Sequence, residues 1–197
     1  HNGIETQRIA YCEHKRNQLR YETGLDNKYV IGFLGRLQQV KNIEYIIDLF
    51  EKIYQTNKET FLLIVGDGLL REKLEEKMRN TFPSEAYCFA GKVKNTEDYL
   101  LEMDVLLLPS LFEGFPITLV EAQCTGLKCL VSTNVSEEVV VTELIERIPL
   151  DKKEIWLDRI RMIALGYKRE SQEIAIKEHY LDMDSVARQI EKIYEDV

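Results

Sequence analysis

Short apolar runs alternate with segments of helical periodicity along the first two thirds of the chain. The runs are apolar without alternation, as expected of strands that are buried on both faces of a sheet. The segments between them place apolar residues three and four positions apart, which predicts amphipathic helices. The expected strands are 29–34, 61–65, 86–90, 105–108 and 129–131, and the expected helices between them are 42–54, 69–78, 96–103 and 117–125.

Strands that alternate with helices predict an α/β fold with a doubly wound parallel sheet. In such sheets ligands bind at the carboxyl ends of the strands. The 197 residues fit one domain, 1–197. Residues 1–28 are polar and lack periodicity, whereas 152–165 and 183–197 predict two further helices. The last helix carries Val186, Ile190, Ile193 and Val197 on one stripe, so it needs a surface to lie against.

Composition narrows the possible partners. The 26 Lys+Arg against 34 Asp+Glu give a formal charge of −8, which argues against nucleic acid but leaves room for one anion bound by local cations. No apolar run approaches the roughly 18 residues of a membrane span, and no signal-peptide pattern is seen, so we expect a cytoplasmic location. The four cysteines form no C-x-x-C pair and the three histidines are scattered. We therefore expect reduced thiols and no metal site.

The most informative segment is 108–130, with the sequence LPSLFEGFPITLVEAQCTGLKCL. A buried strand ends there at a proline, and Pro116 stands where the next helix is expected to begin. Proline suits the first helical position because its missing N–H has no partner there. The amides of the first turn are then available to an anion, assisted by the helix dipole.

Two glutamates stand out in this segment, Glu113 in the loop and Glu121 in the helix. Glu121 shares an apolar helix face with Val120 and Cys124, where a charge is costly unless it is paired, hydrogen-bonded or open to a polar cleft. One interpretation is that the two carboxylates flank a ligand that lies across the helix start. The other is structural: Glu113 caps the helix, and Glu121 meets a lysine or backbone amides.

Polar and glycine-rich segments follow the other expected strands. Arg36 and Lys41, after the first strand, suit phosphate oxygens, although a pair of solvated surface cations is the ordinary alternative. Gly66-Asp67-Gly68 predicts a tight turn before a helix. Gly91-Lys92-Val93 follows the third strand, and Ser110 follows the fourth, where a serine more often bonds local backbone than a ligand.

The segment 108–130 resembles the Glu-x7-Glu signature of retaining glycosyltransferases of the GT-B architecture, family 4, also called group 1. Glu-Gly-Phe-Pro followed by Glu-Ala-Gln-x-x-Gly is a variant of the exopolysaccharide and capsule enzymes. Gly35-Arg36-Leu37 with Lys41-Asn42 is similar to the family's diphosphate-binding loop, and Asn2-Gly3-Ile4-Glu5 to the start of its C-terminal domain. Pro116, Asn42 and Lys128 depart from the common Gly, Gly and Pro.

The resemblance implies that 1–197 is the donor-binding, Rossmann-like C-terminal half of a GT-B fold, without the acceptor-binding N-terminal domain. It implies three catalytic residues: Arg36 and Lys41, which bind the diphosphate, and Glu113, which binds the hydroxyls of the donor sugar. Glu121 is implied to bind the ribose. Glu113 as a covalent nucleophile is a variant that the residues leave open. The further donor contacts that the resemblance implies are Gly35, Lys92, Val93, Gly114, Phe115, Pro116, Ile117 and Thr118.

The same resemblance implies a retaining hexosyltransferase of polysaccharide biosynthesis. Its donor would be a nucleoside-diphosphate sugar, with UDP favoured, and its acceptor a glycan or lipid-linked glycan held by the absent domain. No cofactor or metal is expected, since the cations stabilise the departing diphosphate. The isolated chain should bind donor without transferring sugar, and the whole enzyme should associate with the inner face of the cell membrane. The alternative is a noncatalytic nucleotide-binding or scaffolding module of the same fold.

Overall fold

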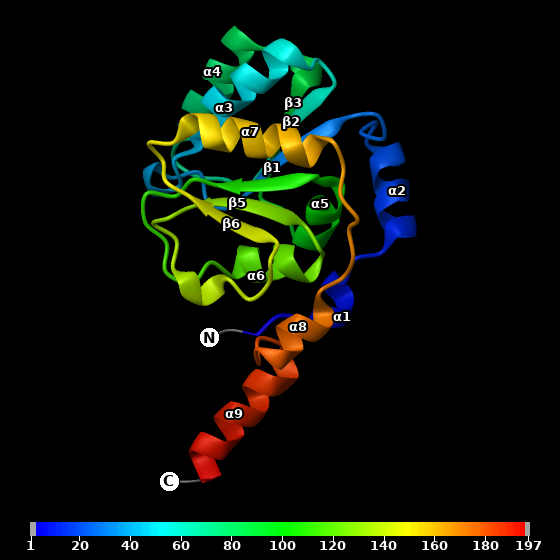
Figure 1. The fold of residues 1–197 in the computed structure, drawn as a ribbon, viewed down its shortest axis with the longest axis vertical. Helices are drawn as coiled ribbons and strands as arrows, with labels where there is room; N and C mark the ends of the chain where they lie inside the picture. The colour runs from blue at the N-terminus through cyan, green and yellow to red at the C-terminus, as the bar shows by residue number, and fades with distance from the viewer. Residues whose placement is uncertain (1–2, 196–197) are drawn as a thin grey trace.

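A single six-stranded parallel sheet forms the centre of the molecule (Figure 1). The computed structural model describes residues 3–195, apart from the side chains of 190 and 193–195. The sheet has the order β3-β2-β1-β4-β5-β6, which is the doubly wound arrangement, with its topological switch point between β1 and β4. The predicted Rossmann-like α/β fold is therefore confirmed. The strands are β1 Tyr29–Leu34, β2 Thr60–Val65, β3 Tyr87–Gly91, β4 Val105–Leu108, β5 Lys128–Ser132 and β6 Ile145–Ile148.

Helices cover both faces of this sheet. Those that follow β1 and β2 lie on one side together with α7, whereas α5 and α6 lie on the other (Figure 1). Beyond them α1 packs beside α8, and α9 leads away from the sheet (Figure 1). The helices are α1 Thr6–Ile9, α2 Glu13–Glu22, α3 Ile43–Thr56, α4 Arg71–Thr81, α5 Thr96–Glu102, α6 Ile117–Cys124, α7 Lys153–Ala164, α8 Glu173–Glu178 and α9 Met183–Glu195.

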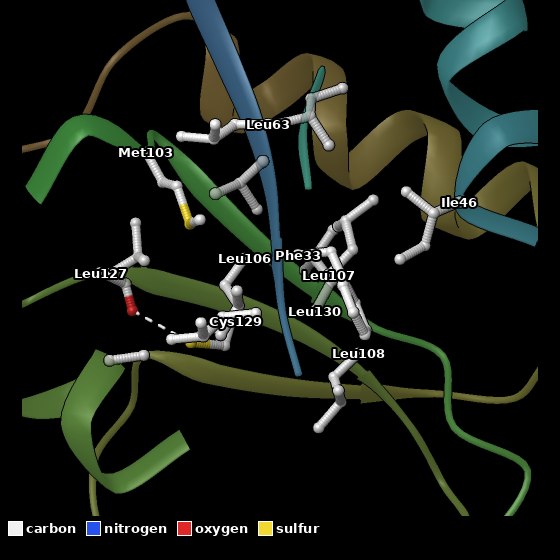
Figure 2. Close-up of a cluster of buried hydrophobic side chains, with 14 of the residues drawn as sticks. Phe33, Ile46, Leu63, Met103, Leu106, Leu107, Leu108, Leu127, Cys129 and Leu130 are labelled. Atoms are coloured by element: carbon white, nitrogen blue, oxygen red, sulfur yellow. Dashed lines mark hydrogen bonds between the residues drawn. The ribbon is translucent and has the colours of Figure 1, made fainter. Parts of the chain in front are cut away.

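The core between the sheet and its helices is closely packed around β1 and β4. Figure 2 shows Phe33, Met103 and Leu106 among the side chains of this cluster. Gly32 in β1 makes room for Met103, because a Cβ at position 32 would lie 2.1 Å from the methionine sulfur. Packing of this density resists small displacements. The carboxyl ends of β1 and β4 are therefore held in fixed relative positions.

Three helices and one strand were not predicted from the sequence. The amino-terminal helix α2 has few apolar residues, and arginines hold it to the body. Arg16 forms an ion pair of 2.5 Å with Asp104 and donates to the carbonyl of Met103 at 2.9 Å. Arg20 donates to the carbonyl of Leu25 at 2.7 Å. Helices α1 and α8 and the edge strand β6 are four to six residues long, too short to show a period.

Two predictions concern the ends of the chain. In the apolar stripe predicted for the last helix, Val186 is half-buried, and Val197 lies outside the described residues. Asn2 of the predicted Asn-Gly turn also lies outside them. All four cysteines are unpaired, as expected; Cys12 and Cys88 are exposed, and the other two are buried. Within residues 3–195, no helix is long and apolar enough to cross a membrane.

Candidate functional site

The loops after β1 and β4 meet at the switch point of the sheet. The Leu111 amide donates to the carbonyl of Val40 at 2.8 Å, and the Asn42 side chain donates to the carbonyl of Pro109 at 3.1 Å. Asn42 has a φ of 54°, in the left-handed region that asparagine tolerates better than most residues. An asparagine here thus both adopts the turn and joins the two loops.

The meeting of these loops brings Lys41 against Glu113. Lys41 ends the short 3-10 helix η1, Gln39–Lys41, and its Nζ forms an ion pair with Oε2 of Glu113. The hydroxyl of Ser110, which is fully buried, donates to the same oxygen at 3.4 Å. The structure therefore joins two of the three residues that the sequence marks as catalytic. Ser110 both supports this carboxylate and accepts a 2.5 Å bond at its own carbonyl from Ser132.

A third loop, after β5, fixes the backbone of Glu113. The Glu113 amide donates to the carbonyl of Asn134 at 3.2 Å, and its carbonyl accepts from the amide of Ser136 at 3.0 Å. This is an isolated parallel bridge between Glu113 and Val135. Sequence reasoning missed residues 134–136, because their contribution is made by backbone atoms that leave no signature in side-chain chemistry.

Arg36 lies on a cleft of about 480 Å³ at the carboxyl ends of the first three strands. Its side chain is exposed and forms no ion pair within the described part of the chain. The predicted donor contacts Gly35, Lys92 and Val93 line the same cleft. The structure thus gathers four predicted residues here, while Lys41, Glu113 and Glu121 lie outside the lining of this cleft.

Glycine allows the loops that wall this cleft to approach each other. Gly66 has a φ of 132°, and a Cβ there would lie 1.8 Å from the carbonyl oxygen of Gly35. The Gly66 amide donates to the carbonyl of Gly91, and the Leu37 amide to the carbonyl of Asp67, each at 2.9 Å. The turn before α4 lies later than predicted: the Arg71 amide donates to the carbonyl of Gly68 at 3.0 Å, so the turn spans 68–71. The glycine-containing segment 66–68 instead joins the loops after β1, β2 and β3.

Helix α6 begins at Ile117, as predicted. Pro116 is its N-cap, with φ −73° and ψ 108°, and not its first helical residue. Proline offers no side-chain acceptor to the first-turn amides, which have no partners within a helix. Phe115 packs against the core, and Ile117 and Thr118 are half-buried. Gly114 is exposed, and a Cβ there would meet no atom within 4 Å.

Glu121 follows one turn into this helix. Its side chain is half-buried, and no residue in the described range 3–195 bonds its carboxylate, so the expected lysine or amide partners are not found. Burial raises the pKa of this carboxyl; the charge of Glu97 raises it further, and that of Arg8 opposes the shift. Arg8 itself pairs with Glu97 at 2.5 Å. A half-buried carboxylate without hydrogen-bond donors is suited to a ligand hydroxyl.

The described residues contain no group of three or more His, Cys, Asp and Glu side chains that could hold a metal ion. An Asp-x-Asp sequence occurs at Asp182-Met183-Asp184, at the start of α9. There Oδ1 of Asp182 accepts from the amide of Ser185 at 3.0 Å, which is a helix-capping arrangement. The Asp-x-Asp at 182–184 is therefore explained by capping of α9.

Residues 15–163 match the family model "Glycosyl transferases group 1". A putative glycosyltransferase, EpsF, of Bacillus subtilis (strain 168) is 30% identical over 174 residues, which cover 86% of this chain and 45% of that protein. The UDP-Gal:alpha-D-GlcNAc-diphosphoundecaprenol alpha-1,3-galactosyltransferase of Escherichia coli is 32% identical over 135 residues, 66% of this chain and 35% of that protein. The chain thus spans less than half the length of these curated relatives.

Solved structures share the fold. Anabaena Alr3699/HepE in complex with UDP and glucose superposes with a TM-score of 0.83 at 18% identity, over 100% of this chain and 56% of that one. The C-terminal domain of a glycosyl transferase group 1 family protein (LpcC) from Francisella tularensis gives 0.72 at 18% identity, over 95% of this chain and 98% of that one. Together with the family match, these findings confirm the resemblance seen in the sequence: the chain belongs to the glycosyl transferases group 1 family.

Proposed function

We propose that this chain is the donor-binding half of a retaining GT-B hexosyltransferase that uses a nucleoside-diphosphate sugar. One observation carries the proposal: a lysine of the loop after β1 and a carboxylate of the loop after β4 meet at the switch point of a doubly wound sheet. Ligands of such sheets bind at this point. UDP is the favoured nucleotide, because HepE, which has the same fold, is described in complex with UDP and with UDP-glucose.

Each residue has a chemical task in this proposal. Arg36 and Lys41 bind the diphosphate, whose charge grows as the sugar leaves. The first-turn amides of α6 support them, since a helix N-terminus favours anions. Glu113 accepts hydrogen bonds from the sugar hydroxyls, and Glu121 accepts them from the ribose. No metal is required, because fixed cations and amide dipoles stabilise the departing diphosphate.

Backbone and apolar contacts complete the donor site in this proposal. Gly35, Lys92 and Val93, which line the cleft beside Arg36, face the nucleotide. Residues 114–118 approach the diphosphate and sugar. The positions of these residues in the fold support their assignment to the donor site, because all of them follow the carboxyl ends of strands or begin α6.

In this proposal the acceptor is bound by a part of the enzyme other than this chain. Because the chain spans 45% of EpsF, the remaining part of a relative is long enough to hold a second domain. The Escherichia coli relative is named for a diphosphoundecaprenol acceptor, which supports a glycan or lipid-linked glycan in polysaccharide biosynthesis. The full enzyme would work at the cytoplasmic face of the membrane, and the isolated chain would bind donor without transferring sugar.

Calorimetric titration of the chain with UDP, GDP and ADP tests the proposal. One of them should bind, and Arg36→Ala should weaken that binding at least tenfold, about 1.4 kcal/mol. Arg79→Ala, which removes an exposed arginine of α4, is the matched control and should leave the affinity unchanged. Equal affinity of wild type and Arg36→Ala would remove Arg36 from the diphosphate site.

Turnover of the intact parent enzyme separates this proposal from a noncatalytic module of the same fold. Glu113→Ala should abolish most of the sugar transfer if Glu113 binds the donor sugar. In a nucleotide-binding or scaffolding module the wild type would transfer no sugar. Glu113→Gln would then leave the ligand affinity unchanged, because no carboxylate need contact a sugar.

A further inference from the structure

The Lys41–Glu113 ion pair joins two side chains that the proposed function, on which this inference rests, assigns to different parts of the donor. Lys41 is assigned to the diphosphate and Glu113 to the sugar, yet in the structure they bind each other. The charge of the lysine is therefore largely neutralised by a carboxylate that lies where the sugar is proposed to sit.

The pair is arranged so that one carboxylate oxygen remains available. Lys41 Nζ and the hydroxyl of Ser110 both bond Oε2 of Glu113. No residue that the structure describes bonds the other oxygen, Oε1. A ligand hydroxyl can therefore donate to Oε1 while Oε2 keeps its partners.

The contact is also held more firmly than a surface ion pair. The two side chains are only 16% and 19% exposed. The backbone of Glu113 is fixed by the loop after β5, and the loops that carry the two residues are joined by the bond from the Leu111 amide to the Val40 carbonyl. Partial burial reduces solvent screening, so each charge strongly affects a ligand placed beside it.

The electrostatic consequence depends on what the terminal phosphate carries. A free nucleoside diphosphate has roughly one further negative charge on that phosphate compared with its sugar-linked form. With Lys41 neutralised, the additional charge meets the Glu113 carboxylate. Arg36 and Lys92, which line the neighbouring cleft, form no ion pair with any residue that the structure describes. A sugar in the same place offers hydroxyl donors to the carboxylate instead.

We propose that the Lys41–Glu113 pair determines specificity by disfavouring a free nucleoside diphosphate relative to its sugar-linked form. The pair thereby favours donor over the diphosphate product that the transfer leaves behind. Glu113 is then more than a sugar ligand, since its charge also weakens binding of a ligand that has no sugar.

The test compares the affinities of the chain for UDP and UDP-glucose by calorimetry at low and moderate salt. Glu113→Gln keeps the shape of the side chain and removes its charge. It should raise the affinity for UDP itself by about fivefold, a gain that loss of a sugar contact does not produce. UDP binding should also become more sensitive to salt, because Lys41 is no longer neutralised. Glu59→Gln is the matched control, since it removes the carboxylate of another lysine–glutamate pair, that with Lys28 at the opposite end of the sheet.

The outcomes are distinguishable. If wild type binds both ligands but Glu113→Gln leaves the affinity for UDP and its salt dependence unchanged, the specificity role is wrong while the proposed function stands. If Glu59→Gln raises the affinity for UDP as much, the effect is one of net charge and the inference is again wrong. If wild type binds neither ligand, the proposed UDP-sugar function fails and this inference with it.

Discussion

Replacing Glu102 by glutamine is expected to stabilise the protein at alkaline pH and to have little effect near pH 5. Glu102 ends α5; the residue is 5% exposed and lines a small surface cleft. The pKa of its carboxyl is raised from 4.5 to about 7, chiefly by burial; Arg20 and Arg16 oppose the shift, and Asp98 adds to it. The folded protein therefore binds this proton more tightly than the unfolded chain does.

The difference between the folded and unfolded pKa of Glu102 gives the sign and size of the change in stability. A raised folded-state pKa gives stability that is fully present below about pH 4.5 and is lost as the pH rises through about 7. The difference of 7 − 4.5 = 2.5 pKa units sets an upper bound of about 3 kcal/mol. Solvent that reaches the cleft screens the charge, so we expect a gain of on the order of 1 kcal/mol for Glu102→Gln at pH 8.5.

Urea denaturation followed by circular dichroism measures this gain. Wild type and Glu102→Gln are compared at pH 5 and pH 8.5, with Glu76→Gln as a control that removes an exposed carboxylate from α4. The gain should appear at pH 8.5, shrink toward pH 5 and be absent in the control. A stability difference that is the same at both pH values, or a less stable variant at pH 8.5, would refute the reasoning.

Three further predictions concern the candidate site. Gly114→Ala should leave the melting temperature unchanged, because its Cβ meets no atom within 4 Å, but should weaken UDP-glucose binding; equal affinity would show that no ligand approaches this backbone. Gly66→Ala should lower the free energy of unfolding by at least about 2 kcal/mol in urea, since its Cβ would lie 1.8 Å from the Gly35 oxygen; a variant as stable as wild type would contradict this. UDP affinity should rise with pH as Glu121 loses its proton, because burial and Glu97 raise its pKa and only the ionised form accepts two ribose hydroxyls. In Glu121→Gln the calorimetric pH profile should be flat over this range, and a profile like that of wild type would remove Glu121 from the ribose.

Much of the architecture is determined locally by the sequence. Continuous apolar runs cannot be exposed on either face of a sheet, so they require covering helices and indicate a parallel arrangement. The expected strand 29–34 coincides with β1, and 105–108 with β4. Glu113 and Glu121 were also identifiable, because a carboxylate beside a helix start or within an apolar face needs a chemical reason.

The elements that the sequence did not reveal lack a local signal. Helix α2 is held by guanidinium groups that bind carbonyls and a carboxylate more than 80 residues away in sequence, such as Arg16 to Asp104. The strand β6 is an edge strand of four residues with two charged side chains at its centre. Periodicity reports which face of a segment is buried, and it reports little for a segment held by hydrogen bonds or located at an edge.

The partners within the site were decided by tertiary structure alone. Lys41 and Glu113 are 72 positions apart, and each alone is compatible with a solvated charge. They meet because the strand order reverses between β1 and β4, so that the loops after these two strands leave the sheet side by side. Strand order depends on long-range packing of the whole sheet, and for that physical reason the sequence specifies the charged residues but only the fold determines which of them neutralise each other.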